Sequence, residues 1–154
     1  MREYIVSTLF LLFTLPVAEQ NVPAGWRVVK DSRSICQIAV PPEWVLLEES
    51  TGAAVLQNTT TAIAVVTSQP DQTFRPLTEF LQKVVVTRKD KMFENSARRI
   101  FYQDKISRNS GDPNAYTASV PARGGTCSGR VTFLPIVSEE TAKKIMLSLG
   151  PAAD

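Results

Sequence analysis

The clearest candidate for a catalytic group is Cys127, which lies in the stretch Gly-Gly-Thr-Cys-Ser-Gly at residues 124–129. This stretch contains Gly-x-Cys-x-Gly, a cysteine version of the Gly-x-Ser-x-Gly turn that presents the nucleophile in α/β-hydrolases. That turn requires a strand that leads directly into a helix. Cys127 is instead followed by Arg-Val-Thr-Phe-Leu at residues 130–134, a pattern that predicts a continuing strand. The sequence therefore disfavours a nucleophile elbow.

The chain contains no histidine, and this limits the chemistry that any nucleophile could perform. Catalysis by a Cys-His or Ser-His pair is excluded because the usual general base is missing. A thiol at Cys127 would need a neighbouring lysine or arginine, or a helix N-terminus, to lower its pKa. The missing histidine also removes the commonest zinc, copper and haem ligand. We therefore expect no catalytic residues, no metal site and no cofactor.

The two cysteines, Cys36 and Cys127, are predicted to form a disulfide. Cys36 alternates in register with Ile38, and Cys127 alternates with Val131, so both cysteines point to the buried side of a strand. A bridge between them would stabilise the fold by about 4 to 5 kcal/mol in the chain-entropy model. It requires an oxidising compartment. The alternative, a cysteine hydrolase, requires Cys127 to be a reduced and exposed thiol of low pKa.

The N-terminus predicts export through a signal peptide. Arg2 precedes an apolar run at residues 4–17, which is too short for a comfortable membrane span and has the length of a secretory core region. Cleavage is predicted after Ala18 or after Ala24, so residues 1–24 are assigned to the signal peptide. Residues 25–154 are assigned to a single α+β domain. The expected location is the periplasm or the extracellular space, with no stable membrane span after processing.

Composition favours one globular domain and argues against nucleic-acid binding. The chain has 154 residues, of which 44% are hydrophobic and 21% charged, with a formal net charge of +2. Binding to a phosphate backbone needs a concentrated basic surface. The densest basic region, residues 88–99, is interrupted by Asp90 and Glu94. We expect this region to be a solvated face and the chain to bind no nucleic acid.

Runs of strand-like residues dominate the rest of the chain. Alternation, β-branched residues and bounding turn residues predict strands at residues 26–30, 35–40, 45–48, 53–57, 61–68, 96–105, 115–120 and 127–134. Residues 109–114 are predicted to be a loop. The first two strands are separated by four turn-prone residues, which indicates a hairpin.

Two helices are predicted among these strands. The first has Pro76 in its opening turn and an apolar stripe, which is expected to pack on a sheet and consists of Leu77, Phe80, Leu81 and Val84. The second is capped by Ser138 and stopped by Gly150 and Pro151. Its apolar face consists of Ala142, Ile145, Met146 and Leu149. The fold class is therefore α+β, with a central antiparallel sheet and two main helices packed against it.

Three aromatic residues, Phe101, Tyr102 and Tyr116, are candidates for a ligand cleft. They could line a pocket if one face of the sheet is partly open between the two helices. The alternative is that these residues fill the core. The pattern of the sequence leaves both interpretations open.

Three segments, AVPPEW (39–44), PLTEFLQKV (76–84) and ETAKKIMLSLGP (140–151), resemble the PsbP/Mog-like superfamily in their order and spacing. The resemblance implies an α+β sandwich with an antiparallel sheet flanked by helices, and it implies no catalytic residues. Members of this superfamily are accessory proteins that support photosystems or bind other proteins. Export favours the bacterial DcrB-like branch or a related one.

The leading hypothesis is an exported, non-enzymatic accessory or binding protein. Its partner is expected to be a protein or a cell-envelope component, bound through a sheet edge or a groove beside a helix. The alternative is a carrier of a small apolar ligand, with a pocket lined by Phe101, Tyr102 and Tyr116. The oligomeric state does not follow from the sequence.

Overall fold

The computed structural model describes residues 22–48, 52–56, 61–87, 91–105 and 113–153. Within these residues the strands form two antiparallel sheets. The larger sheet contains, in spatial order, β3 (Val45–Glu48), β4 (Ala53–Leu56), β5 (Ala62–Pro70), β9 (Gly125–Phe133), β8 (Asn114–Ala122), β7 (Ile100–Lys105) and β6 (Lys91–Asn95). The smaller sheet contains β1 (Arg27–Lys30), β2 (Cys36–Val40) and β10 (Gly150–Pro151).

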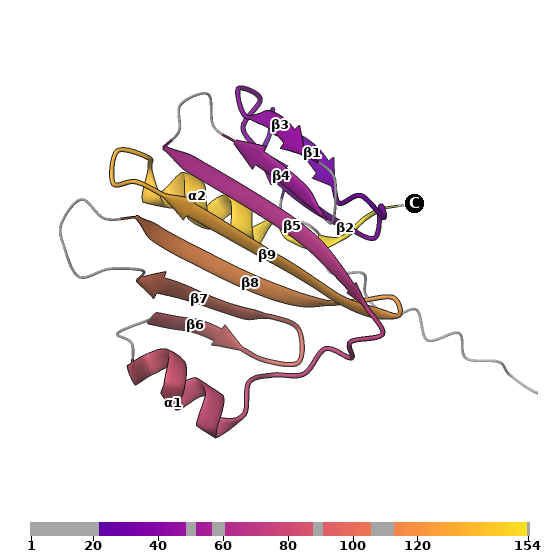
Figure 1. Ribbon diagram of the computed structural model, residues 1–154, viewed down its shortest axis with the longest axis vertical. Helices are drawn as coiled ribbons and strands as arrows, with labels where there is room; N and C mark the ends of the chain where they lie inside the picture. The colour runs from indigo at the N-terminus through magenta and orange to yellow at the C-terminus, as the bar shows by residue number, and fades with distance from the viewer. Residues whose placement is uncertain (1–21, 49–51, 57–60, 88–90, 106–112, 154) are drawn as a thin grey trace, which may run out of the picture.

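Helix α2 (Glu139–Leu147) and the small sheet cover the same face of the large sheet (Figure 1). Alternation along β9 explains this arrangement: Val131 and Phe133 are buried, whereas Arg130 and Thr132 point to the other face and are half-buried. The core lies between the layers, and its largest buried side chains are Trp44, Tyr116, Phe133, Ile38, Ile145, Met146 and Leu149. Burial of these apolar side chains is the main force that holds α2 on the sheet.

The opposite face of the large sheet is polar. The hydroxyls of Ser119 and Ser128 lie 3.1 Å apart there, and the Arg130 guanidinium pairs with the Asp104 carboxylate at 2.7 Å. Among the described residues, no helix lies in front of β5, β9 and β8 on this side (Figure 1). The polar character of the face agrees with contact with solvent.

The small sheet is joined to the large one by a buried carboxylate. Asp31 accepts hydrogen bonds from the backbone N–H groups of Ile35 and Cys36, each at 2.9 Å, and from the Ser68 hydroxyl at 2.5 Å. Burial alone would raise the pKa of Asp31, but these hydrogen bonds outweigh it and lower the pKa below the ordinary value. A turn between β1 and β2 is thereby fixed to β5.

The α+β class is confirmed, and the expectation of a central antiparallel sheet with two helices is roughly consistent with the structure. The fold is mostly β and has two sheets. The predicted strand at residues 96–105 is in the structure a turn at residues 96–99 followed by β7. Residues 96–99 form the turn between β6 and β7, where the Ser96 N–H donates to the Arg99 carbonyl at 2.9 Å. Strand β10 was not expected either, since its two residues pair with β2 directly after the end of α2.

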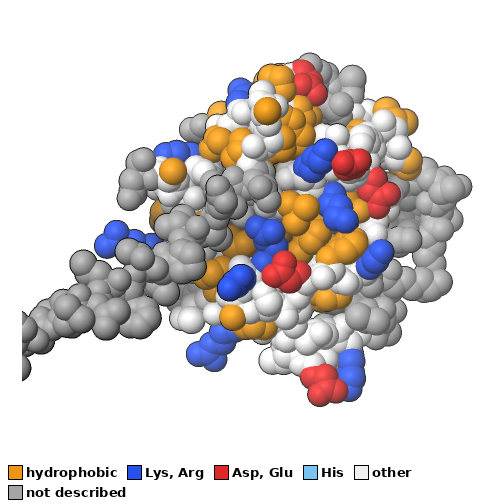
Figure 2. Space-filling view, turned by 180° about the vertical axis from the view of Figure 1, so that it is seen from behind, with side chains coloured by type: hydrophobic (Ala, Val, Ile, Leu, Met, Phe, Trp, Pro, Cys, Tyr) orange, Lys and Arg blue, Asp and Glu red, His pale blue; other side chains and the backbone are white. Residues whose placement is uncertain are grey.

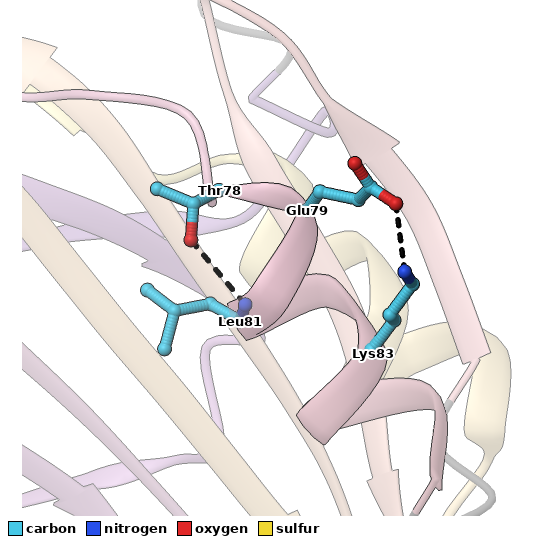
Figure 3. Close-up of polar contacts among 4 residues, drawn as sticks. All are labelled: Thr78, Glu79, Leu81 and Lys83. Atoms are coloured by element: carbon cyan, nitrogen blue, oxygen red, sulfur yellow. Dashed lines mark hydrogen bonds and ion pairs between the residues drawn. The ribbon is translucent and has the colours of Figure 1, made fainter.

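Helix α1 (Glu79–Thr87) corrects a second expectation. It lies beside β6 at the edge of the large sheet (Figure 1), and Phe80 is 73% exposed, Leu81 44% and Val84 37%. The helix begins after Thr78, whose hydroxyl accepts the Leu81 N–H at 3.3 Å, so Pro76 precedes the helix (Figure 3). The apolar stripe exists, but these three residues do not pack on the sheet.

Helix α2 agrees with its prediction at its N-terminus, but it ends at Leu147, so Leu149 lies beyond it and Gly150 and Pro151 form β10. The Ser138 hydroxyl accepts the Thr141 N–H at 3.3 Å and caps the first turn, and Ala142, Ile145 and Met146 are buried. Ser148 ends the helix; its N–H bonds to carbonyls of the last turn, and its hydroxyl accepts the Ala39 N–H at 2.7 Å. The end of α2 is thereby tied to β2.

The signal peptide assigned to residues 1–24 falls mainly on residues 1–21, which lie outside the described residues. It stays a prediction, as does the assignment of residues 25–154 to a single domain. Most of the predicted loop at residues 109–114 also lies outside the described part. A bilayer-spanning helix of sufficient length and apolarity is not found in the part of the chain that the structure describes.

Candidate binding groove

The Gly-x-Cys-x-Gly stretch is a structural feature of β9. Cys127 lies inside this strand and is bridged to Cys36, with 5.5 Å between the two Cα atoms. The predicted disulfide is therefore confirmed, and Cys127 offers no thiol for catalysis. Gly124 occupies the turn between β8 and β9 with a φ of 75°, in the left-handed region that favours glycine. The strand continues to Phe133 without the helix that a nucleophile elbow needs.

Gly129, the last residue of the stretch, provides room for the end of α2. A Cβ atom at this position would lie 3.3 Å from Leu149 Cδ1 and 3.4 Å from the Met146 sulfur. These side chains would have to move for a larger residue to fit. The glycine therefore sets how closely α2 approaches the sheet.

Four aromatic rings form a continuous cluster on the inner face, beneath the N-terminal part of α2. Phe93 stacks on Phe101 with 5.0 Å between the ring centroids, and Tyr116 stacks on Phe133 at 5.7 Å. The centroids of Phe101 and Tyr116 also lie 5.7 Å apart. Such offset and tilted contacts stabilise aromatic pairs beyond the area that they bury.

The three residues predicted to line a cleft are divided between the two faces of the sheet. Phe101 and Tyr116 lie together on the inner face, where both are buried. Tyr102 lies opposite Thr117 in the register of β7 and β8, one position along from Phe101, and therefore points to the outer face. Tyr116 lines the groove described next, whereas Phe101 packs beneath it.

A groove of about 610 Å³ lies between α2 and the strands β6, β7 and β8. Its lining consists of Lys91, Phe93, Gln103, Tyr116, Glu139, Glu140, Lys143, Lys144 and Leu147. Figure 2 shows this side of the molecule, where basic and acidic side chains border exposed hydrophobic ones. The floor of the groove is aromatic and its rim is charged.

The Tyr116 hydroxyl connects the floor to the rim. It donates a hydrogen bond to Glu139 Oε1 at 2.5 Å. Burial raises the pKa of Tyr116 above its ordinary value of 10.0, and the hydrogen bond and negative charge of Glu139 raise it further. Tyr116 is therefore a neutral donor at physiological pH.

Two glutamate–lysine pairs with the same spacing on α2 behave differently. Glu140 and Lys144 form an ion pair at 2.9 Å, which lowers the pKa of Glu140 through the hydrogen bond and the charge of Lys144. Glu139 and Lys143 also stand four residues apart, but Glu139 accepts from Tyr116 instead. The Lys143 ammonium group lies over the Phe93 ring, 4.8 Å from its centroid.

A second ammonium group reaches the same ring. Lys91 Nζ lies 5.1 Å from the Phe93 centroid. No ion pair to Lys91 or Lys143 is found among the described residues. The two ammonium groups therefore share one aromatic ring, and the charge of Lys143 also contributes to the lowered pKa of Glu140.

Gln103 adds a buried amide to the groove. The residue is only 9% exposed and lines the groove from β7, opposite Tyr116 in the register of β7 and β8. A glutamine amide offers two donors and one acceptor, so this group can hydrogen-bond to a ligand.

The groups that line the groove are suited to binding. Both cysteines are in the bridge, and the sequence has no histidine to act as a base. Across residues 22–48, 52–56, 61–87, 91–105 and 113–153, no cluster of three or more metal-ligating side chains is present. What the groove offers is aromatic surface, lysine ammonium groups and the Gln103 amide.

Sequence reasoning missed Lys91, Phe93, Gln103 and Lys143 as groove residues. The alternation of Lys91, Phe93 and Asn95 with Met92 and Glu94 does not separate apolar from polar residues, so it was only a weak signal for β6. No local signal could place Lys143 over Phe93, because the two residues come from elements far apart along the chain.

Comparison with known proteins identifies the fold alone. No protein-family model matches the chain. No curated protein matches it. The solution structure of cyanobacterial PsbP (CyanoP) from Synechocystis is similar, with a TM-score of 0.51 and 10% sequence identity over 85% of this chain and 95% of that one. The chain therefore has a PsbP-like fold, and nothing in the likeness singles out the DcrB-like branch.

Proposed function

We propose that this chain is an exported, non-catalytic binding protein that holds a segment of a partner protein in the groove between α2 and β6, β7 and β8. The observation that carries the proposal is the composition of the groove: an aromatic floor with Phe93 and Tyr116, and two lysine ammonium groups over the Phe93 ring that form no ion pair among the described residues. Aromatic residues bordered by polar groups are typical of protein-binding surfaces.

Export is supported by the disulfide and by the apolar N-terminal run. The bridge between Cys36 and Cys127 is of a kind that persists in oxidising compartments such as the periplasm or the extracellular space. A non-catalytic role is supported by the missing histidine and by the use of both cysteines in the bridge. The PsbP-like fold is compatible with an accessory role, since a fold does not itself supply an activity.

Site-specific photocrosslinking in the envelope of the native host tests this proposal. A photoreactive residue in place of Leu147, which lines the groove, is expected to give a crosslinked adduct with the mass of a polypeptide. The matched control is the same substitution at Ile63, which is 37% exposed on the outer face of β5. Equal adducts from both positions, or none from Leu147, would contradict binding in the groove.

The second candidate is a carrier of a small apolar ligand. The observation that favours it is the aromatic cluster of Phe93, Phe101, Tyr116 and Phe133 directly beneath the groove. Native mass spectrometry of the freshly purified full chain separates the two candidates. A co-purifying small molecule, lost from the Phe93→Ser variant, supports the carrier and contradicts the partner protein.

A further inference from the structure

We propose that the groove recognises an acidic, extended segment of its partner, in which a Glu or Asp carboxylate is held by the ammonium groups of Lys91 and Lys143. The inference deepens the proposed function and rests on it, because it names the chemistry of the segment that the groove would hold.

The ammonium groups of Lys91 and Lys143 are suited to binding an anion, because their contacts with the Phe93 ring are weaker than hydrogen bonds to a carboxylate would be. Lys91 Nζ and Lys143 Nζ share one ring, at 5.1 and 4.8 Å from the Phe93 centroid. A cation over an exposed aromatic ring is held weakly compared with a cation that is hydrogen-bonded to a carboxylate. Two like charges beside one ring also repel each other, and an anion that approaches both removes this repulsion.

The negative charges of the rim are already committed. Glu139 accepts the Tyr116 hydroxyl at 2.5 Å, and Glu140 pairs with Lys144 at 2.9 Å. The lining holds three lysines (Lys91, Lys143 and Lys144) and two glutamates (Glu139 and Glu140), so its formal net charge is +1. Charge complementarity of this kind selects acidic partners over basic ones.

Gln103 points to a polypeptide and not to a simple anion. Gln103 lines the groove and is only 9% exposed as a whole residue. A glutamine amide is complementary to a backbone amide, because each offers an N–H donor and a C=O acceptor. An extended peptide would therefore satisfy Gln103 with its backbone, the two lysines with a carboxylate, and Leu147 with an apolar side chain.

Fluorescence anisotropy with synthetic peptides tests the inference on the full, disulfide-bonded chain. The probe is a labelled nine-residue peptide of alternating Glu and Phe, and the matched probe replaces every Glu with Gln. The wild-type protein is expected to bind the Glu peptide at least about tenfold more tightly than the Gln peptide. The difference should shrink as salt is added, because screening weakens exposed charge pairs.

The double variant Lys91→Met, Lys143→Met is expected to lose this preference, since methionine keeps the apolar stem but not the charge. The control variant is Lys83→Met on α1, which removes one exposed lysine away from the groove. It should keep the preference. Gln103→Leu should weaken the binding of both peptides and leave their ratio unchanged, because the amide is expected to contact backbone. Melting temperatures confirm that each variant is folded before binding is compared.

Equal binding of the Glu and Gln peptides by the wild type would overturn the inference, as would a preference that survives in the double variant. The inference and the proposed function fail separately. A polypeptide adduct from position 147 without a preference for the Glu peptide leaves the proposed function standing and rejects the acidic segment. If the wild type prefers the Glu peptide but position 147 gives no polypeptide adduct, the proposal of a partner protein is rejected. The proposal that an acidic segment of that partner binds in the groove is then rejected with it.

Discussion

Glu139 decides which group Lys143 contacts by its own choice of hydrogen-bond partner. At four residues from Lys143 it has the spacing at which the next pair along, Glu140 and Lys144, forms an ion pair at 2.9 Å. It accepts the Tyr116 hydroxyl instead, at 2.5 Å. One buried hydroxyl on a strand thus leaves one lysine of the helix free to face the groove.

The Tyr116→Phe variant tests this interaction. Loss of a hydrogen bond to a partly exposed carboxylate is expected to lower the free energy of unfolding by about 1 kcal/mol, measured by urea denaturation at pH 7. The folded-state pKa of Tyr116 is raised above its ordinary value of 10.0. The stability that the Tyr116 hydroxyl contributes is therefore complete below pH 10.0. It is lost as the pH rises through the folded-state pKa of Tyr116.

The control is Tyr102→Phe, which removes a tyrosine hydroxyl from the outer face of β7. It is expected to change the free energy of unfolding by less than about 0.5 kcal/mol. If the two variants lose the same free energy, or if the loss in Tyr116→Phe stays constant above pH 10.0, the account of the Tyr116 hydroxyl is wrong.

The two helices have similar apolar stripes but different roles. Residues of α2 and its end are buried between the sheets, whereas Phe80, Leu81 and Val84 of α1 are exposed. The segment before α1 is held instead by Asn95 of β6, whose side-chain amide exchanges hydrogen bonds with the Leu77 backbone at 2.8 and 3.1 Å. A periodic stripe determines which residues share a face, but the tertiary fold decides what covers that face.

The same substitution on both elements measures this difference. Leu149, just beyond α2, is 1% exposed, and Leu81 of α1 is 44% exposed. Leu149→Ala is expected to lower the free energy of unfolding by about 2 to 5 kcal/mol, because it leaves a cavity in the core. Leu81→Ala should cost less than about 1 kcal/mol. Equal losses in urea denaturation would mean that α1 packs more firmly than its exposure indicates.

On the scale of the whole molecule, the disulfide is the covalent link between the two sheets. Cys36 of β2 and Cys127 of β9 are separated by 91 residues, and both are fully buried. The chain-entropy model predicts a stabilisation of about 4 to 5 kcal/mol for a loop of this size, since the bridge restricts the unfolded chain.

The double variant Cys36→Ala, Cys127→Ala should therefore unfold at a much lower urea concentration than the bridged wild type. The expected loss in the free energy of unfolding is about 4 kcal/mol. The control is alkylation of the unreduced wild type after unfolding, which should detect no thiol. An unchanged urea midpoint in the variant would reject the stabilising role of the bridge.

The elements that depend on neighbours along the chain could be predicted from the sequence. Strand β3 was expected at its observed bounds, and Ser138 was expected to cap α2. The disulfide was also expected, because alternation placed both cysteines on the buried side of a strand. Strand β6 was missed because its alternation includes charged residues, and β10 was missed because two residues carry no pattern.

Residue types and local spacing by themselves determined the α+β class, the bridge, and the lack of a base for Cys127, since each depends on composition or on near neighbours. Tertiary structure alone decided that α1 lies at the sheet edge, that Tyr102 and Tyr116 occupy opposite faces, and that Lys91 and Lys143 meet over Phe93. Those outcomes require β6 and α2 to come together across tens of residues. Long-range packing, which local propensity does not encode, brings them together.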